Sequence, residues 1–410
     1  MISEPLPLSL AMLLILLAAR MLGEIFERMK QPAMIGEILA GVILGPSLLN
    51  VVQITPEIKI IADLGVFLLV IIAGMEIDLN QIIKSIRGRS AWIAILGFII
   101  PMISGLAIGY IFSLNFTLSL FIALCISITA LPVSVRILMD LGKLQSDIGQ
   151  KIISAAIFND VVSLLVLGVV LDINSNDQKV SELFVSVGFT ILKVIGFMAL
   201  VVLSNRLIRK TTERMSMFKI KVDFIIDFLK GKESLFAIVI TFVLLFASIS
   251  EIVGLHFVVG AFFGAMLLSH ELFSKEKFEE IHKSTSSITM GFLAPIFFAS
   301  MGLEFNFLSL TNIALLIVII FSSFASKIIA GYLGGKLAGM NNLESFTLGM
   351  GLNSRGIIEL VIANIALKNG FIDISVFSIL VLMGIVTTVL SPIVLKNSFA
   401  ALDRKKQVNR

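Results

Sequence analysis

Residues 121–138 read FIALCISITALPVSVRIL, an apolar run long enough to span a bilayer, with a proline inside it. In a continuous helix, Pro132 would lack a backbone donor, and its ring would clash with the carbonyl of residue 128. The run therefore predicts two half-helices joined by an unwound stretch around Thr129 and Ala130. One proline kink in a membrane helix is ordinary and usually structural. The stretch indicates a functional site only if a second interruption matches it.

A second apolar stretch, residues 347–366, is weakened by glycine. It reads TLGMGLNSRGIIELVIANIA, where Gly351 and Gly356 flank polar residues and disfavour a regular helix. We therefore predict a second interruption here, close to Ser354.

Two pairs of short motifs indicate that the chain contains an internal repeat. AGMEIDL (73–79) resembles SMGLEFNF (300–307) about 228 positions later, and GVILG (41–45) resembles GAFFG (260–264) about 219 positions later. Each match alone is weak, because close helix packing also explains small residues at such spacing. A duplication of seven helices would have opposite topologies in its two copies, which is typical of secondary transporters. The same spacing places the two interruptions at corresponding positions, so we predict that they form one site.

The composition is that of a membrane protein. Of the 410 residues, 57% are hydrophobic and 15% are charged, and the mean hydropathy is +1.04. Soluble domains are usually about 45–50% apolar and about a quarter charged, so the composition argues against an aqueous enzyme. We expect an all-α polytopic fold with about thirteen spans, near residues 7–26, 33–50, 58–78, 91–112, 116–138, 148–171, 181–203, 234–250, 254–270, 285–303, 307–335, 344–367 and 371–395.

Cysteine and histidine give no pattern of metal or redox chemistry. Cys125 is the only cysteine, so neither a disulfide framework nor a cysteine metal cluster is available. His256, His270 and His282 stand at the ends of apolar runs without the spacing of metal ligands. We expect solvated or capping roles for these histidines, and we expect no cofactor.

The basic residues predict the orientation of the chain. Of the 32 Lys and Arg residues, 25 fall around loops that follow odd-numbered spans or near the C-terminus, and three fall on the opposite side. The positive-inside rule then places the N-terminus outside the plasma membrane and the C-terminus in the cytoplasm. The positive charge thus reports topology and does not indicate nucleic-acid binding. The basic stretch 204–233 is expected to link the two halves, with contact to anionic lipid as the alternative.

Four ionisable residues lie deep in the predicted spans. Asp160 stands in SAAIFNDVVSLLV (154–166). Inserting a lone acid at the centre of a membrane helix costs at least about 2.5–3.5 kcal/mol, so Asp160 should be paired, hydrated or functional. Lys327 is open to three roles: neutralising a carboxylate, bonding to half-helix carbonyls, or snorkelling, which its central position disfavours. Arg355 and Glu359 are four residues apart on one helical face, so a structural ion pair is available to them.

With these features the chain resembles the monovalent cation:proton antiporter-2 family, the Kef-type sodium/proton and potassium/proton exchangers. The likeness covers roughly residues 7–397. Six motifs carry it in order, each weak alone: IGEILAGVILGPSLL (35–49), AGMEIDL (73–79), SITALPVSVRIL (127–138), AAIFNDVVSLL (155–165), FASKIIAGYLGGKLAG (324–339) and GLNSRGIIELVIA (351–363).

The resemblance implies a homodimer of thirteen-helix protomers with the Na⁺/H⁺ antiporter fold, in which two broken helices cross. Residues 1–80 and 234–306 would form scaffold and dimer helices, and residues 81–175 and 307–397 would form a mobile core. Residues 176–233 would hold a linker helix and the basic loop, and residues 398–410 a cytoplasmic tail. No nucleotide-binding regulatory domain is expected in this chain, so the control by NAD or glutathione adducts of larger relatives is not predicted.

The resemblance also implies an ion site at Asp160, which matches the family's ion-binding aspartate. Thr129 matches a threonine whose backbone and side chain can assist coordination, and Lys327 matches the lysine of the core. Hard alkali cations want several oxygen ligands, so carbonyls near Thr129, the Asn159 amide, Ser154 and water are the other expected ligands. Competition of the cation and a proton for Asp160 predicts exchange of Na⁺ or K⁺ for H⁺ by alternating access.

Asn159 bears on the stoichiometry of this exchange. In electrogenic relatives its position holds a second aspartate, and an amide cannot titrate, so electroneutral 1:1 exchange is predicted. A Lys327 that itself loses a proton would restore an electrogenic cycle. The alternative function is a sodium-coupled symporter of an organic anion on a similar inverted-repeat fold, with Arg355 as the substrate anchor. A channel or sensor on the same scaffold is a further alternative.

Overall fold

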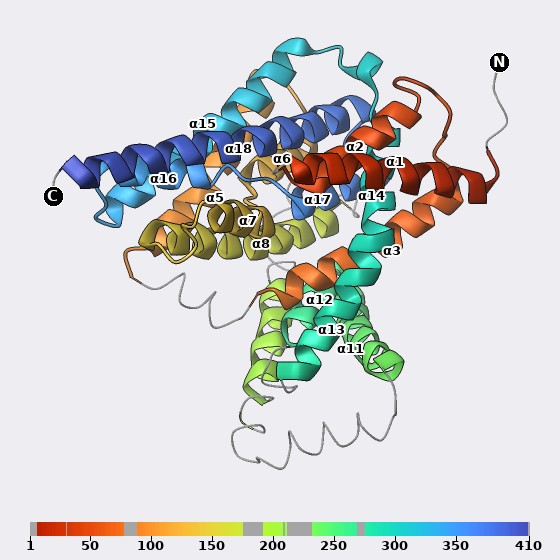
Figure 1. Ribbon diagram of the computed structural model, residues 1–410. Helices are drawn as coiled ribbons and strands as arrows, with labels where there is room; N and C mark the ends of the chain where they lie inside the picture. Colours follow the sequence, from red (N-terminus) through yellow and green to blue (C-terminus); the bar gives the residue numbers. More distant parts are fainter. Residues whose placement is uncertain are drawn as a thin grey trace. The chain divides into compact units, whose positions relative to one another are not determined.

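The computed structural model describes residues 6–29, 31–77, 88–174, 192–207, 210, 232–268 and 275–408, and within these ranges its regular elements are helical (Figure 1). Besides the helical residues 192–207, the helices in chain order are α1 (Leu8–Arg28), α2 (Ala33–Leu44), α3 (Pro56–Met75), α5 (Ala91–Ile111), α6 (Phe116–Ser127), α7 (Leu131–Asp140), α8 (Asp147–Asn174), α11 (Lys232–Val253), α12 (Phe257–Met266), α13 (Lys275–Ile288), α14 (Ala294–Glu304), α15 (Ile313–Leu337), α16 (Asn342–Gly351), α17 (Ile357–Lys368) and α18 (Ile374–Val408). A π-helical turn (Thr289–Leu293) joins α13 to α14, and a 3-10 turn (Phe307–Ser309) precedes α15.

The helices have the length and composition of a multi-pass membrane protein. Among the described residues, eight helices are long and apolar enough to cross a membrane, and α2, α6 and α12 are shorter apolar helices. The span predicted near 181–203 is described only from residue 192, and most of the basic stretch 204–233 lies outside the described residues.

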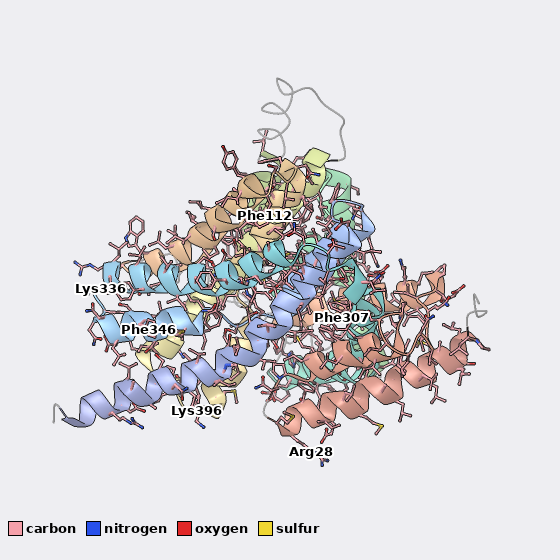
Figure 2. All side chains as sticks on the ribbon, turned by 90° about the horizontal axis from the view of Figure 1, so that it is seen from above. Arg28, Phe112, Phe307, Lys336, Phe346 and Lys396 are labelled. Atoms are coloured by element: carbon pink, nitrogen blue, oxygen red, sulfur yellow. The ribbon has the colours of Figure 1, made fainter. Side chains whose placement is uncertain are left out.

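The chain divides into two compact units. The first comprises residues 1–62, 80–163 and 295–410, and the second comprises residues 63–79 and 164–294. In the first unit, Arg28 and Lys336 stand in the last turns of α1 and α15 (Figure 2), where a cation is favoured by the helix dipole. The predicted site residues all belong to the first unit. The predicted division into scaffold and core helices stays a prediction.

The order of the helices repeats along the chain. α11 and α12 each begin 224 residues after α1 and α2, and α16 and α17 each begin 226 residues after α6 and α7. In both halves the second span is short and the fifth is broken into two half-helices. The internal repeat that two weak motifs predicted is therefore present in the helix boundaries.

Glycines of the repeat motifs let helices touch backbone to backbone. In the first unit, a Cβ added to Gly41 of α2 would lie 1.9 Å from the carbonyl oxygen of Ala299 in α14, and one added to Gly302 of α14 would lie 2.0 Å from a carbonyl oxygen of α2. In the second unit, a Cβ added to Gly74 of α3 would lie 2.4 Å from the carbonyl oxygen of Phe262 in α12. Close packing, the local interpretation of these glycines, is confirmed. In a repeat that relates α2 to α12 and α3 to α14, the contact of α2 with α14 corresponds to the contact of α12 with α3. Both contacts therefore agree with the repeat.

Local sequence sets where the half-helices begin. The Asn115 side chain caps α6 by accepting a hydrogen bond from the Leu118 main-chain nitrogen at 2.7 Å. At the corresponding place in the second half, Asn341 caps α16 in a capping box with Glu344. Pro132 stands in the first turn of α7, where proline is favoured because no donor is needed there. The cap residues therefore fix the starts of the broken helices in both halves.

Several helix boundaries differ from the predictions, and two of the differences have a clear physical reason. The last helix, α18, continues to Val408 instead of ending near residue 395. Most residues from Ala401 to Gln407 have a high helix propensity, so the helix continues through the charged residues there. The span predicted at 285–303 begins earlier, at Lys275 of α13, because polar residues precede its apolar part in one continuous helix.

One histidine role is confirmed within the described residues. His256 caps α12, since its Nδ1 accepts a hydrogen bond from the Val258 main-chain nitrogen at 3.4 Å. His270 lies outside the described residues.

Candidate functional site

The two broken helices meet at their interruptions, which lie where the sequence predicted them. The gap between α6 and α7 covers residues 128–130, and the gap between α16 and α17 covers residues 352–356. The main-chain nitrogen of Ala130 donates to the carbonyl of Ser354 at 2.9 Å. A Cβ added to Gly356 would lie 2.5 Å from the Cβ of Ala130, so glycine lets the two gaps touch.

The predicted helix breakers stand at the edges of these gaps. Pro132 is the second residue of α7, and Ile128 and Ala130 before it have extended backbones, with ψ angles of 145° and 122°. Gly351 is the last residue of α16, and a Cβ there would lie 2.2 Å from Cδ1 of Ile152 in α8. The gaps leave main-chain polar groups without partners in their own helices, so other parts of the chain must bond to them.

Asp160 lies in the middle of α8 and faces the start of α7. Its side chain is buried, and its Oδ2 accepts a hydrogen bond from the main-chain nitrogen of Leu131 at 3.4 Å. Leu131 is the first residue of α7, so the carboxylate stands at the positive end of that half-helix. The end of the half-helix therefore compensates part of the buried negative charge.

The hydroxyl of Thr129 connects three parts of the crossing. It accepts hydrogen bonds from Lys327 Nζ at 2.7 Å and from Asn159 Nδ2 at 3.2 Å, and it donates to the carbonyl of Leu352 at 3.0 Å. A hydroxyl has two lone pairs and one hydrogen, so these contacts use its full hydrogen-bonding capacity. They also orient the Asn159 amide, whose Oδ1 has no hydrogen-bond partner among the described residues.

Lys327 donates to three oxygens. Besides Thr129, its Nζ bonds to the carbonyl of Gly97 in α5 at 2.9 Å and to the carbonyl of Ser127. Ser127 is the last residue of α6, whose final carbonyls form the negative end of the helix dipole. Lys327 is fully buried and does not snorkel. Of the roles that the sequence left open, bonding to half-helix carbonyls is present, and Lys327 also interacts electrostatically with Asp160 and Glu359.

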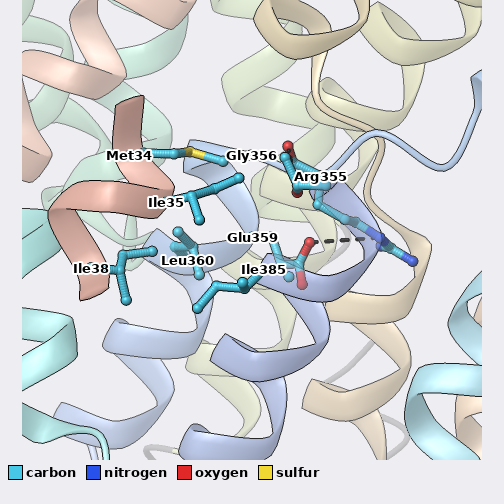
Figure 3. Close-up of a pocket in the computed structure, with 10 residues that line it drawn as sticks. Met34, Ile35, Ile38, Arg355, Gly356, Glu359, Leu360 and Ile385 are labelled. Atoms are coloured by element: carbon cyan, nitrogen blue, oxygen red, sulfur yellow. Dashed lines mark hydrogen bonds and ion pairs between the residues drawn. The ribbon is translucent and has the colours of Figure 1, made fainter. Parts of the chain in front are cut away.

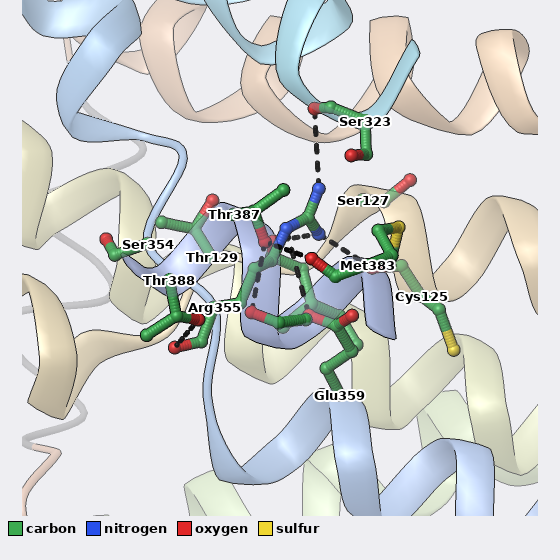
Figure 4. Close-up of polar contacts among 12 residues, drawn as sticks. Cys125, Ser127, Thr129, Ser323, Ser354, Arg355, Glu359, Met383, Thr387 and Thr388 are labelled. Carbon is green, nitrogen blue, oxygen red and sulfur yellow. Dashed lines mark hydrogen bonds and ion pairs between the residues drawn. The ribbon is translucent and has the colours of Figure 1, made fainter. Parts of the chain in front are cut away.

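Arg355 bonds to the same end of α6, as Figure 4 shows. Its Nη1 donates to the carbonyls of Cys125 at 2.7 Å and Ile128 at 2.8 Å, and its Nη2 donates to the carbonyl of Ser323 in α15 at 3.4 Å. Its Nε lies 3.7 Å from Glu359 Oε2, so the ion pair predicted from their spacing is present. Arg355 thus joins the second gap to the first broken helix and to α15.

Sequence reasoning missed several groups at the crossing. Gly97 and Leu352 take part through main-chain carbonyls, which leave no mark in a sequence. The hydroxyl of Ser134 lies 2.5 Å from that of Ser354, and a serine two residues after Pro132 in the predicted broken span was the signal that could have found it.

Ser154 makes no hydrogen bond to these residues in the part of the chain that the structure describes, and its role as a ligand stays a prediction. It is half-buried and precedes Asp160 by six residues on α8. At about 100° per residue, its side chain leaves the helix on a different face from that of Asp160.

The arrangement can hold one small cation or one proton. Asp160 and Asn159 are consecutive residues of α8, and both side chains are buried. Hard alkali cations prefer oxygen ligands, and the unwound main chain of the gaps adds carbonyl oxygens close by. Lys327 and Arg355 donate hydrogen bonds to carbonyls of α5, α6 and the first gap, so these two side chains connect the helices near Asp160.

Comparisons with known proteins place this architecture in a family. The family described as sodium/hydrogen exchanger, transmembrane, matches residues 12–399. The Na⁺/H⁺-K⁺ antiporter GerN of Bacillus cereus is 26% identical over 97% of each chain. The probable Na⁺/H⁺ antiporter 3 of Methanocaldococcus jannaschii is 27% identical over 94% of this chain and 95% of its own length.

A solved structure shares the fold. The sodium proton antiporter MjNhaP1 from Methanocaldococcus jannaschii, solved at pH 8, matches with a TM-score of 0.70 over 96% of this chain and 98% of the other, at 15% sequence identity. The predicted antiporter fold is confirmed by this match, and the predicted membership of a monovalent cation:proton antiporter family is confirmed by the family match. The chain belongs to the sodium/hydrogen exchanger family.

Proposed function

We propose that this chain is a secondary transporter that exchanges a monovalent cation for H⁺ by alternating access, with Na⁺ as the first candidate cation and K⁺ as the second. The observation that carries the proposal is the position of Asp160, a buried carboxylate beside two crossing interrupted helices. Relatives named Na⁺/H⁺ antiporters, and GerN, named an Na⁺/H⁺-K⁺ antiporter, support this choice of ions.

The alternative of an organic-anion symporter is not supported. That reading needed Arg355 as a substrate anchor, but its guanidinium bonds to three main-chain carbonyls and is fully buried. The relatives are named antiporters, which also favours exchange over symport.

A single site serves both ions in this proposal. A proton on Asp160 removes the charge that holds a cation, and a bound cation excludes the proton, so exchange follows when the site faces each side in turn. We assign the Asp160 carboxylate and Asn159 Oδ1 as side-chain ligands, with carbonyls of the gap at 128–130 and water completing the shell. The Thr129 hydroxyl, whose lone pairs are occupied, positions Asn159 and Lys327.

The contacts of Lys327 favour electroneutral 1:1 exchange. An amide at position 159 cannot titrate, which leaves one acid on this part of α8. The ammonium group of Lys327 has three donors, and each has an oxygen acceptor, an arrangement that suits a lysine that keeps its proton. One titrating carboxyl per cation then moves no net charge.

Purified protein in liposomes with a trapped pH dye tests the proposal. After a proton gradient is established, Na⁺, K⁺ or Li⁺ is added to wild type, to Asp160→Asn and to Asp147→Asn. We expect cation-dependent proton movement that is lost in Asp160→Asn. The matched control Asp147→Asn removes an exposed acid from the first turn of the same helix, so it should behave as wild type.

Different results of these experiments would contradict the proposed site and the proposed stoichiometry. Proton movement without any cation dependence, or full exchange in Asp160→Asn, would remove the proposed site. A current of one net charge per cycle in solid-supported membrane recordings would overturn electroneutrality while leaving exchange in place.

Orientation and assembly complete the proposal. We place the N-terminus outside and the C-terminus in the cytoplasm of the plasma membrane, from the distribution of basic residues. We also propose a homodimer through residues 1–80 and 234–306, which rests on the family resemblance. Cross-linking of single-cysteine variants in native membranes tests both.

A further inference from the structure

A small cavity lies between α2, α17 and α18 in the first unit. It has about 10 Å³ of room for water-sized spheres, which is about the space of one water molecule. Met34, Ile35 and Ile38 of α2 and Ile385 of α18 form apolar parts of its wall. Figure 3 shows the charged side chains of Arg355 and Glu359 on the same wall, so the cavity is neither wholly apolar nor far from the crossing.

Glu359 presents to this cavity a carboxyl group without a hydrogen-bond donor. Its side chain is 1% exposed, and neither Oε1 nor Oε2 has a hydrogen-bond partner among the described residues. Arg355 stands 3.7 Å from Oε2 and gives its Nη donors to three carbonyls instead. Buried carboxylates are normally hydrogen-bonded, because an ionised group without donors is strongly destabilised. Glu359 therefore needs a water molecule or a proton to satisfy its oxygens.

Three ionisable groups act on Glu359 electrostatically. Arg355 and Lys327 are the cations, and the Cys125 thiol of α6 is the remaining group. The two cations favour the ionised form, while burial favours the neutral form. These effects oppose each other, so neither form of the carboxyl group is fixed by its surroundings.

The other helices around the cavity add no further charge to its wall. The acid of α2, Glu37, lies against Gly23 of α1 and Arg20 instead. α18 contributes Gly384, Ile385 and Thr388, which do not titrate. A Cβ added to Gly384 would lie 3.5 Å from Glu359 Oε1, so the space beside the carboxyl group exists because this residue is glycine.

We propose that Glu359 is a second proton-binding group of this protein, hydrated from the cavity, and that its protonation acts through Arg355 on the crossing. Ionised Glu359 attracts the guanidinium group through Nε, whereas neutral Glu359 does not. The same guanidinium holds the carbonyls of Cys125 and Ile128, directly before Thr129. Proton binding at Glu359 thus changes the electrostatic attraction on the Arg355 guanidinium group, which holds the carbonyls at the first gap. The coupling to transport, but not the proton binding itself, rests on the proposed function.

Infrared difference spectroscopy tests the proton binding without measuring transport. Spectra of reconstituted protein are taken from about pH 5 to about pH 9, a range in which buried carboxyl groups titrate. We expect a carboxyl C=O band that titrates in wild type and in Asp160→Asn and is lost in Glu359→Gln. Glu344→Gln is the matched control, because it removes a half-buried acid of the same unit and keeps the capping box.

Two further variants keep the proposal open to contradiction. If Glu359→Gln does not fold, Glu359→Asp should move the frequency of the band. Gly384→Ala adds a methyl group beside Oε1 without changing any charge, and it should shift the pH at which the band titrates. Exchange in Glu359→Gln should lose the pH-dependent step that follows the band.

The results distinguish this inference from the proposed function. Identical titrating bands in wild type and Glu359→Gln would overturn proton binding at Glu359, even if exchange depended on Asp160. An unchanged pH profile of exchange in Glu359→Gln, with the band lost, would overturn the coupling through Arg355. Exchange that persisted in Asp160→Asn would contradict the proposed function alone, and the band would still report on Glu359.

Discussion

The two interrupted helices occupy corresponding places in the repeat, but they contribute different hydrogen-bonding groups to the crossing. The first gap follows the end of α6, whose carbonyls accept from both buried cations. The second gap contains Arg355 itself and supplies the carbonyl of Leu352 to Thr129. The first half therefore accepts hydrogen bonds from both cations, whereas the second half contributes the Arg355 donor together with the carbonyls of Leu352 and Ser354, which accept from the first gap.

This difference shows how a symmetric fold produces an asymmetric site. The negative end of α6 attracts Lys327 and Arg355, while the positive end of α7 faces Asp160. Opposite charges are thus separated by only the residues 128–130 between two half-helices. Asp160 therefore lies at the start of one half-helix, while Lys327 and Arg355 donate hydrogen bonds at the end of the other.

Arg355→Ala should give the largest effect. It removes the donor from three carbonyls and leaves Glu359 without its cation, and breaking a buried pair costs about 3–5 kcal/mol. The unfolding midpoint in detergent measures this loss. The control Arg28→Ala breaks an exposed pair with Glu24 and should lower the free energy of unfolding by less than about 1 kcal/mol. Equal losses in the two variants would show that the second gap does not depend on its cation.

Thr129→Val tests the hydroxyl that accepts hydrogen bonds from Lys327 and Asn159. Without the hydroxyl, Lys327 and Asn159 each lose an acceptor, which should cost about 1–3 kcal/mol of stability. Groups that orient an ion's ligands typically change affinity by about 10-fold to 100-fold, and exchange should fall accordingly. Thr347→Val removes a buried hydroxyl bonded to Ser398 in the same unit and should reduce stability but not exchange. A loss of exchange in Thr347→Val as well would assign both effects to folding.

Gly356→Ala should force the two gaps apart. The new Cβ would meet the Cβ of Ala130 at 2.5 Å, and overpacking of this kind costs about 1–3 kcal/mol. Gly351→Ala offers a comparison, because its Cβ would meet the mobile end of the Ile152 side chain, which can rotate away. Thermal unfolding should therefore rank Gly356→Ala below Gly351→Ala. The reverse order would mean that the gaps do not touch at Gly356.

Lys143→Ala should give the smallest effect. Lys143 bonds to Asp403 at the far end of α18, but both side chains are partly exposed. Exposed pairs contribute about 0–1 kcal/mol and are screened by salt. The difference between Lys143→Ala and wild type should shrink when unfolding is repeated at high salt. A large, salt-independent loss would indicate that the end of α18 supports the crossing.

The helix interruptions and the charged residues of the site could be predicted from the sequence, but the hydrogen bonds between them could not. Pro132 and the glycines of 347–366 disrupt helices through local sterics, so both gaps could be placed from the residues alone. Asp160 and Lys327 were identifiable because charge is rare in apolar spans. The acceptors of Lys327 were not, since Gly97 and Ser127 act through main-chain carbonyls that every residue carries.

Side-chain direction was the other limit. The hydroxyl of Thr129 is saturated by hydrogen bonds to neighbours that only the folded chain brings to it, so these contacts could not be predicted, and a role of Thr129 in coordinating the cation stays a prediction. The predicted end of the last helix near residue 395 was too early, because helix propensity continues α18 through the charged residues that follow. The cavity beside Glu359 depends on Gly384 of another helix, which no local pattern indicates.

The most direct test of the central claim is the number of protons released when a cation binds to the purified protein. Na⁺ or K⁺ is added to weakly buffered wild-type protein, and proton release and cation binding are measured on the same sample. Competition at Asp160 predicts close to one proton released per cation near the pH at which half of the sites are protonated, and no cation-linked release in Asp160→Asn. Cation binding without proton release in wild type, or unchanged release in Asp160→Asn, would contradict the account.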